Sequence, residues 1–384
     1  MGIRVLKERL IDRETFFILL FVSLATAAFF PVVYNNAVWY GTVKYLIFVV
    51  LIYLATATRV VNALKSKIII VSLVIVCFIF IQLLIFYSQN FNVRWSDLTC
   101  LLIVVLFMSV GYCSQIDERQ TEIVVIVFAI FAAVAGLWSM FYYVGSLTLN
   151  DYLYAVDAKN QIGQFVASAT TGIMILLFAN KRFRFIKIGL LTLLVILLLV
   201  LRCRTALLAF LFFAVMYYYK TLKARDAVFL VLTLSILMIL FYAPVLSFLE
   251  DVFVGNKDID DLNSVSSNRL ERNIDGFDFW FSNSIFGELQ TPSGIARIHN
   301  YLINILVAYG LFSFPFIVLY FHLLVVAAKR WKKVNVLHIG SVGYWVMFIP
   351  FFCSLLEPSA PYGPGLVQAV PFFLFGNSMR PCNR

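Results

Sequence analysis

The chain has 384 residues, of which 62% are hydrophobic and only 13% are charged, and its net charge is +10. A mean hydropathy of +0.93 excludes an ordinary water-soluble protein, because apolar runs long enough to cross a bilayer recur along the chain. The cations gather at the ends of these runs, so the basic charge reflects membrane orientation, and we expect no nucleic-acid partner.

The apolar runs predict an all-α fold, a polytopic transmembrane bundle of about 12 spans. A helix needs about 20 apolar residues to cross the hydrocarbon core. Hydropathy places spans at 15–34, 42–58, 68–88, 96–113, 123–143, 161–179, 185–201, 205–219, 227–243, 300–327, 337–354 and 363–378. We expect three parts: spans 1–9 (1–243), one large periplasmic loop containing short helices (244–298), and spans 10–12 with a short cytoplasmic tail (299–384).

The basic residues assign a side to each connection. With the N-terminus inside, 21 of the 30 lysines and arginines lie in cytoplasmic segments, Lys187 among them, as the positive-inside rule requires. The outer side keeps Lys44, Arg94, Lys159, Arg202, Arg204, Lys257, Arg269, Arg272 and Arg297. Because these nine cations are placed against the positive-inside rule, we consider them candidate functional residues.

The large outer loop contains a predicted amphipathic helix. Four apolar residues at spacings of four, three and four share one face: Leu270, Ile274, Phe277 and Phe281. Ser266 or Ser267 can cap its start, and Arg269 and Arg272 share another face. We expect this helix to lie over the outer mouth of the bundle with its aromatic side down.

Two outer sequences can bind anions or sugars at the start of a span. Arg202 and Arg204 either snorkel to lipid head groups or turn one guanidinium inward, where it can hold phosphate oxygens in bidentate fashion. Lys159, Asn160 and Gln161 open another span, and their amides either cap the helix or hydrogen-bond sugar hydroxyls.

A third outer sequence carries a group that can move a proton. Arg297, His299 and Asn300 precede the span at 300–327, and His299 is the one histidine on the outer side. It is either an interfacial side chain or a neutral imidazole that accepts a proton from an attacking hydroxyl. Glu288, Asp275 and Asp278 are alternative bases, each of which can equally be a solvated loop carboxylate. The six cysteines suggest neither a metal site nor a disulfide framework.

From about residue 155 to 325 the chain resembles the superfamily of O-antigen polymerases and O-antigen ligases. The matching motifs, in the family's order, are Lys159-Asn160-Gln161-Ile162-Gly163, Cys203-Arg204-Thr205-Ala206-Leu207, Asn268-Arg269-Leu270, Ser284-Ile285-Phe286-Gly287, His299-Asn300-Tyr301-Leu302 and Tyr309-Gly310-Leu311. Cys203 departs from the family's Ser or Thr, Ser284 and Ile285 from its Pro-Leu, and no proline precedes His299.

The resemblance implies a metal-independent membrane glycosyltransferase without a cofactor, in the bacterial inner membrane with its active site facing the periplasm. Its donor would be a glycan on undecaprenyl diphosphate. Family roles map onto Arg204 and Arg269 as a clamp on the diphosphate, and onto His299 as general base or positioning group. Arg202, Arg272 and Arg297 have no clear counterpart in the family. We expect them to bind substrate, together with Asn300 and the Lys159–Gln161 stretch.

The resemblance leaves the acceptor open. We expect a polymerase, which transfers a growing chain onto the next lipid-linked repeat unit; the Lys159-Asn160-Gln161 start favours it, and a separate chain-length regulator is a possible partner. The alternative is a ligase, whose acceptor is the lipid A core. A flippase for lipid-linked oligosaccharides is a second alternative, but transport favours charges and broken helices within the spans.

Overall fold

The computed structural model describes residues 12–144, 159–201, 203–221, 263, 266, 268–295, 298–333, 338–358, 360–363 and 366–380, and these residues are helical with no strand. Six described helical stretches are long and apolar enough to cross a membrane: Ala37–Ala57, Lys67–Ser88, Trp95–Cys113, Glu118–Phe141, Asn160–Ala179 and Tyr301–Trp331. The prediction of an all-α chain with helices long and apolar enough to cross a membrane is confirmed. The number of twelve spans stays a prediction, and the span at 227–243 lies outside the described residues.

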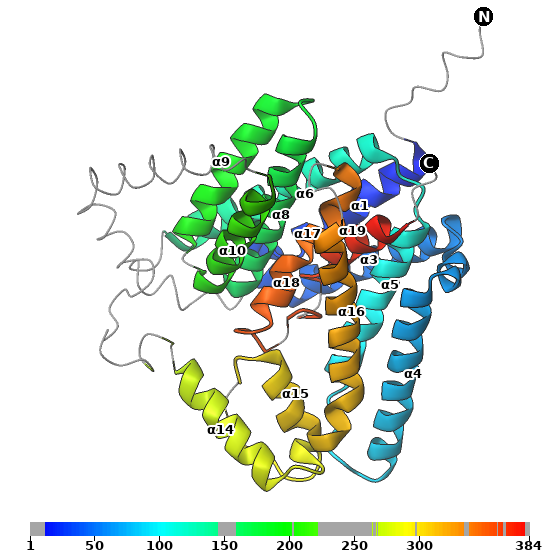
Figure 1. Ribbon diagram of the computed structural model, residues 1–384, viewed down its shortest axis with the longest axis vertical. Coiled ribbons are helices and arrows are strands. Elements are labelled where there is room, and N and C mark those ends of the chain that lie inside the picture. Colours follow the sequence, from blue (N-terminus) through cyan, green and yellow to red (C-terminus); the bar gives the residue numbers. More distant parts are fainter. Residues whose placement is uncertain are drawn as a thin grey trace, which may run out of the picture.

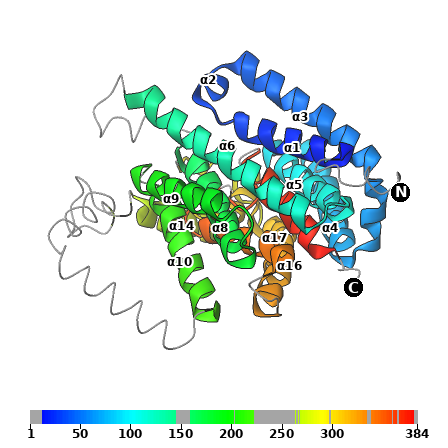
Figure 2. The same ribbon diagram turned by 90° about the horizontal axis from the view of Figure 1, so that it is seen from above.

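The N-terminal third forms two groups of helices. Its elements are α1 (Arg13–Ala27), α2 (Pro31–Tyr34), α3 (Ala37–Ala57), the 3-10 helix η2 (Val60–Lys65), α4 (Lys67–Ser88), α5 (Trp95–Cys113) and α6 (Glu118–Val144). Helices α3 and α6 pack on either side of α1, as the view in Figure 2 shows. Helices α4 and α5 form a pair along the long axis of the molecule (Figure 1).

The centre of the bundle is built around α8 (Lys159–Ala179), which packs against α6, α9 (Arg184–Val200) and α10 (Arg204–Thr221). Within its apolar stretch 83% of the residues are buried. Gly163 permits the closest approach, since a Cβ built there would lie 2.5 Å from the sulfur of Cys203. Small residues let transmembrane helices approach in this way. The starts of α8 and α10 therefore lie side by side.

The predicted span at 300–327 is not one straight helix. It divides into α15 (Tyr301–Tyr309), the 3-10 turn η5 (Gly310–Ser313) and α16 (Phe314–Lys333). The rings of Tyr301 and Tyr320 are 5.7 Å apart, whereas 19 residues of straight helix would separate them by about 28 Å. The chain reverses at Gly310, whose φ of +56° suits glycine. Figure 1 shows α16 rising beside α4 and α15 descending to the turn.

The last predicted span is too short to cross a membrane. The helices after α16 are η6 (Ile339–Ser341), α17 (Val342–Val346), α18 (Phe348–Cys353) and α19 (Ala369–Met379). The 11 residues of α19 extend about 17 Å, roughly half the hydrocarbon thickness. Every residue from Ala369 to Gly376 is buried. A Cβ at Gly376 would lie 2.0 Å from the Met108 carbonyl oxygen, so α19 packs against the backbone of α5 as an internal helix.

One predicted loop cation is buried. Lys187 has no exposed surface, and its ammonium group bonds Glu122 at 2.6 Å, the Leu176 carbonyl at 3.0 Å and the Asn180 carbonyl at 2.8 Å. By the positive-inside rule it belongs to the cations of the cytoplasmic segments. The first turn of α9 instead packs beside the end of α8, where unpaired carbonyls attract a cation. Two backbone carbonyls accept hydrogen bonds from the ammonium group, and Glu122 balances its charge.

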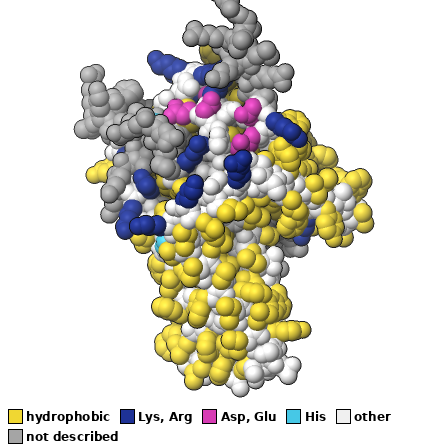
Figure 3. Space-filling view, turned by 90° about the vertical axis from the view of Figure 1, so that its right-hand side faces the viewer, with side chains coloured by type: hydrophobic (Ala, Val, Ile, Leu, Met, Phe, Trp, Pro, Cys, Tyr) yellow, Lys and Arg dark blue, Asp and Glu magenta, His cyan; other side chains and the backbone are white. Residues whose placement is uncertain are grey.

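Connections that are distant in the sequence contact one another at two opposite ends of the molecule. Three predicted inner segments meet at one end, where Arg380 donates to the Ser114 carbonyl at 3.0 Å and the Gln115 amide donates to Glu14 at 2.8 Å. At the opposite end the α4–α5 turn meets the 3-10 helix η4 (Gly287–Leu289) through the Asn92 amide and the Leu289 carbonyl. Charged side chains gather at the upper end in Figure 3, and hydrophobic side chains cover the lower part.

Candidate functional site

The connection after α18, residues 354–358, is the centre of a polar cluster at the predicted outer side. The start of helix α15 contacts it through three hydrogen bonds. The backbone N–H of Tyr301 donates to the Ser354 carbonyl. The side-chain amides of Asn300 and Asn304 donate to the Leu355 and Pro358 carbonyls, respectively. The amphipathic helix α14 (Arg269–Ser282) reaches it through Arg269. The short connection therefore joins residues distant in the sequence.

Arg269 links α14 to α10 and to this connection. Its Nη1 donates to Thr205 Oγ1 at 3.0 Å and to the Leu356 carbonyl at 2.9 Å, while Nη2 lies 3.2 Å from Glu357 Oε1. The Thr205 hydroxyl also donates to Glu357 at 3.4 Å. Thr205 directly follows Arg204, the first residue of α10. The structure thus brings Arg269 to the helix start that carries Arg204.

Glu357 is the residue that the sequence reasoning missed. Its side chain is only 7% exposed and accepts hydrogen bonds from Arg269, Thr205 and Asn160. Burial raises the pKa of its carboxyl above the ordinary value, and the positive charge of Arg269 opposes that rise. An acidic residue between two apolar runs on the predicted outer side, followed by Pro358, was the available signal.

His299 is held by the second arginine of α14. Arg272 Nη1 lies 3.3 Å from His299 Nε2. Because a guanidinium only donates, Nε2 must be the acceptor, which places the proton of the neutral ring on Nδ1. In this arrangement Nε2 is occupied. The geometry therefore favours His299 as a positioning group over a base that accepts at Nε2, and its Nδ1 atom is buried.

The start of α8 joins the cluster through Asn160. The Cys203 thiol donates to Asn160 Oδ1 at 3.6 Å, and the Asn160 side chain also bonds Glu357. Arg204 is half-buried at the start of α10, and Gln161 is half-buried in the first turn of α8. Lys159 begins α8, but its side chain, like Arg202 and Arg297, lies outside the described residues.

The three alternative bases are not part of this cluster. Glu288 forms an ion pair with Arg94 and accepts a hydrogen bond from Ser293. Asp275 and Asp278 are exposed on α14, away from the residues that contact Arg269. Their carboxylates are thus either committed to another partner or solvated. Glu357 replaces them as the carboxylate at the site.

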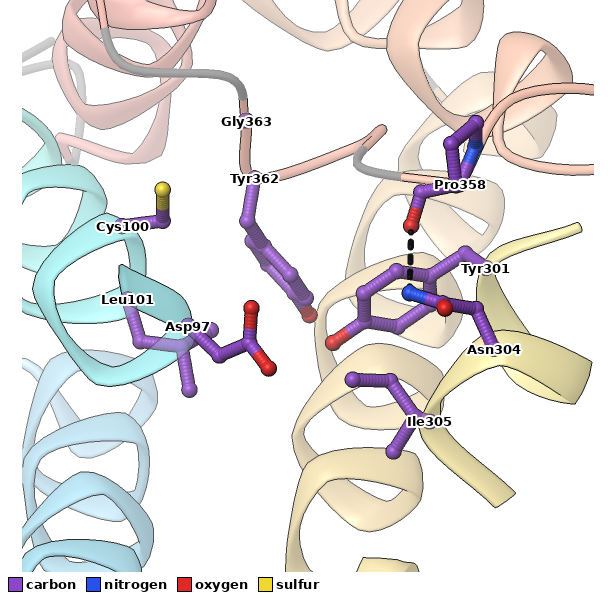
Figure 4. A pocket seen from close by; sticks show the side chains of 9 residues that line it. All are labelled: Asp97, Cys100, Leu101, Tyr301, Asn304, Ile305, Pro358, Tyr362 and Gly363. Carbon is purple, nitrogen blue, oxygen red and sulfur yellow. Dashed lines mark hydrogen bonds between the residues drawn. The ribbon is translucent and has the colours of Figure 1, made fainter. Parts of the chain in front are cut away.

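A small cavity adjoins the cluster below Pro358. Its volume is about 100 Å³, enough for roughly three water molecules and too small for a sugar ring. The lining residues are Asp97, Cys100, Leu101, Tyr301, Asn304, Ile305, Pro358, Tyr362 and Gly363. Figure 4 shows the Asp97 carboxylate and the Tyr301 and Tyr362 hydroxyls directed into the same space. The buried Tyr362 hydroxyl has no partner among the described residues, so a bound water can satisfy it.

The cluster combines fixed guanidinium groups, an imidazole of defined tautomer and a buried carboxylate. Such a set can hold an oxyanion and orient a hydroxyl without a metal ion. Among the described residues no group of three or more His, Cys, Asp or Glu is placed to hold a metal. Compared with known proteins, the chain matches no family model and no curated sequence.

Proposed function

We propose that the chain is a membrane glycosyltransferase that transfers an oligosaccharide or polysaccharide from undecaprenyl diphosphate to an acceptor sugar hydroxyl on the periplasmic face of a bacterial inner membrane. The observation that carries the proposal is the contact of Arg269 with Thr205, beside Arg204. Two arginines from distant segments are thereby placed at one helix start, next to a histidine that a third arginine orients. The motif resemblance supplies the donor class.

Cations at this position would act on the leaving group. Cleavage of the sugar–phosphate bond leaves a diphosphate, so negative charge grows on its oxygens in the transition state. Fixed guanidinium groups aimed at those oxygens stabilise the transition state more than the ground state. Arg269 is already oriented by Thr205 and the Leu356 carbonyl. We assign Arg204 and Arg269 to this clamp, with the Arg202 and Arg297 guanidiniums as further substrate contacts.

Glu357 gives the clamp a competing partner. In this structure Arg269 is paired with Glu357, so a diphosphate that binds Arg269 brings a second anion towards a buried carboxylate. Like charges in proximity favour the protonated acid. Donor binding should therefore raise the pKa of Glu357 further and draw a proton onto it. Glu357 then serves as the group that holds Arg269 in place before the donor arrives.

The acceptor distinguishes the favoured polymerase from the ligase. His299 and Asn300 lie at the start of α15 beside the cluster, where they can orient an acceptor hydroxyl. A lipid-linked repeat unit makes the enzyme a polymerase of surface polysaccharide, with a chain-length regulator as partner. A lipid A core makes it a ligase. The Asn160 contact to Glu357 involves the span start that favours the polymerase.

The transporter alternative has one observation in its favour, the buried pair of Lys187 and Glu122. Intramembrane ion pairs often serve transport. Here, however, Lys187 also donates to two backbone carbonyls at the end of α8, which hold its ammonium group in place. That arrangement is suited to joining helices. The polar cluster at the opposite end supports chemistry at one membrane surface.

Deletion of the gene followed by complementation tests the proposal. A polymerase deletion should leave lipopolysaccharide with one repeat unit, whereas a ligase deletion leaves bare core and accumulates lipid-linked polymer. Arg204→Ala, Arg269→Ala and His299→Ala should each abolish long chains while the protein remains in the membrane. Lys44→Ala is the matched control, since it removes an exposed outer cation distant from the cluster. Unchanged chain length in the deletion strain would refute the enzyme assignment.

A further inference from the structure

The exposed surface of α14 is divided into two sectors of different chemistry. Its predicted apolar face does not pack on the bundle: Leu270 is 46% exposed, Ile274 52%, Phe277 40% and Phe281 71%. At about 100° per residue these four side chains fall within a sector of about 60°. The expectation that the aromatic side lies down on the bundle is therefore wrong.

The second exposed sector is acidic, and a third sector faces the protein. Glu271, Asp275 and Asp278 are exposed and lie about 100° around the helix from the apolar residues. The inward sector carries Arg269, Arg272 and the buried Gly276, whose missing side chain lets Ile298 and Ile303 approach within about 3 Å of its Cβ position. Because this glycine face makes the contact with α15, the apolar face is left outside.

Both ends of α14 are fixed at the ends of candidate membrane spans. At its start, Arg269 bonds Glu357, which in turn bonds Asn160 at the beginning of α8. Beyond its end, the Leu311 amide bonds the Ser284 and Ile285 carbonyls directly before α16. The next residues reach the end of α4 through the Asn92–Leu289 hydrogen bond. Both ends of α14 are thus held by residues at the ends of candidate membrane spans.

The apolar sector continues into neighbouring exposed residues at the turn between α15 and α16. Ile285 is 54% exposed, Leu311 62% and Phe314 67%. Phe314 is the first residue of α16 and therefore belongs to a candidate membrane span. The apolar side of α14 is thus continuous with exposed apolar residues of a candidate membrane span.

We propose that α14 is an interfacial helix whose Leu270, Ile274, Phe277 and Phe281 face is inserted among the acyl chains of the adjacent bilayer leaflet. The acidic sector then faces water, as expected for a helix that lies at the boundary of hydrocarbon and head groups. The inward arginines are consequently held at the depth of lipid phosphates. This inference does not depend on the glycosyltransferase assignment, because it concerns the bilayer and not the substrate.

Photo-cross-linking of the full-length protein in phospholipid nanodiscs tests the insertion. Benzoylphenylalanine replaces Phe277 or Phe281 in the apolar sector, and Asp275 or Asp278 in the acidic sector serves as the matched control. After irradiation, intact mass reports the gain of one phospholipid. We expect lipid adducts at Phe277 and Phe281 to exceed those at the two acidic positions at least about fivefold.

Two results would overturn the proposal. Equal lipid adducts in the two sectors would show that α14 is not partitioned at the boundary. With benzoylphenylalanine at position 277 or 281, a doubled mass would indicate a cross-link to a second copy of the chain. Consumption of the benzophenone without a mass gain would indicate a cross-link within the same chain. Either result would show that protein covers the face. As an independent measurement, Phe281→Trp fluorescence should be quenched by brominated phospholipid more strongly than Asp278→Trp fluorescence, each corrected for the native tryptophans. Equal quenching would also contradict the insertion.

Discussion

The pairing of Arg269 with Glu357 predicts a strong energetic coupling between α14 and the connection after α18. Arg269→Met removes three polar contacts, to Thr205, to the Leu356 carbonyl and to Glu357. It also leaves the Glu357 side chain, only 7% exposed, without its countercharge. Breaking one partner of a buried pair costs about 3–5 kcal/mol. Because the Arg269 side chain is 22% exposed, we expect Arg269→Met to lower the free energy of unfolding by about 3 kcal/mol, at the lower end of this range.

The companion variants separate the charge pair from its surroundings. Glu357→Gln keeps an acceptor oxygen towards Thr205 but loses the negative charge, which should cost about 1–2 kcal/mol. In the double variant Arg269→Met with Glu357→Gln no buried charge is left unpaired. We therefore expect the two effects to be non-additive, with a coupling free energy of about 1–3 kcal/mol.

Unfolding in mixed detergent micelles, followed by circular dichroism over a denaturant series, measures the four free energies of this cycle. A matched cycle on Arg269 and the exposed Asp275 should show no coupling, since the two side chains lie on different faces of α14. The pair does not hold α14 to the connection if the losses in unfolding free energy of the two single variants sum to that of the double variant within about 0.5 kcal/mol. That result would refute the reasoning about the site.

Three further predictions concern the bundle and pH. Lys187→Met should lower the free energy of unfolding by about 3–5 kcal/mol because it leaves the buried Glu122 carboxylate unpaired, and adding Glu122→Leu should restore most of the loss; thermal unfolding of both variants measures this. Gly310→Ala should destabilise by about 2 kcal/mol, since it forces a side chain into a positive-φ turn, whereas Gly189→Ala, with open space at its Cβ position, should change stability little in the same assay. Because the folded-state pKa of Glu357 lies above its ordinary value of 4.5, its contribution to stability is full below pH 4.5 and is lost as pH rises through the folded-state pKa. Melting temperatures measured across that range should therefore decline less in Glu357→Gln than in the unsubstituted protein, and parallel curves would contradict the assignment.

The approximate positions of the long helices follow from local hydropathy and can be predicted from the sequence. The stretch predicted at 68–88 corresponds to α4, Lys67–Ser88, and the stretch predicted at 161–179 to α8, Lys159–Ala179. A continuous apolar run of this length has no better way to satisfy its backbone in a membrane than to form a helix. Hydropathy does not report where a run folds back, so the reversal at Gly310 was not predicted.

The residues of the site were predicted less evenly than the helices. Charge placed against the orientation bias indicated Arg269 and Arg272, and His299 was identified as the one histidine on the outer side. Contacts between distant segments bring these residues to one cluster. Glu357 was missed, because its importance depends on α8, α10 and α14 converging on one short connection. No local pattern encodes that convergence.

The sequence by itself determined that the chain is helical, is built for a membrane and carries unusual cations on one side. Only the tertiary structure decided which face of α14 packs, which cation is buried, and which carboxylate meets Arg269. The physical reason is that helix formation depends on neighbours along the chain, whereas helix orientation depends on glycines such as Gly276 and Gly376 that let particular backbones approach. Those contacts exist only once distant segments have met.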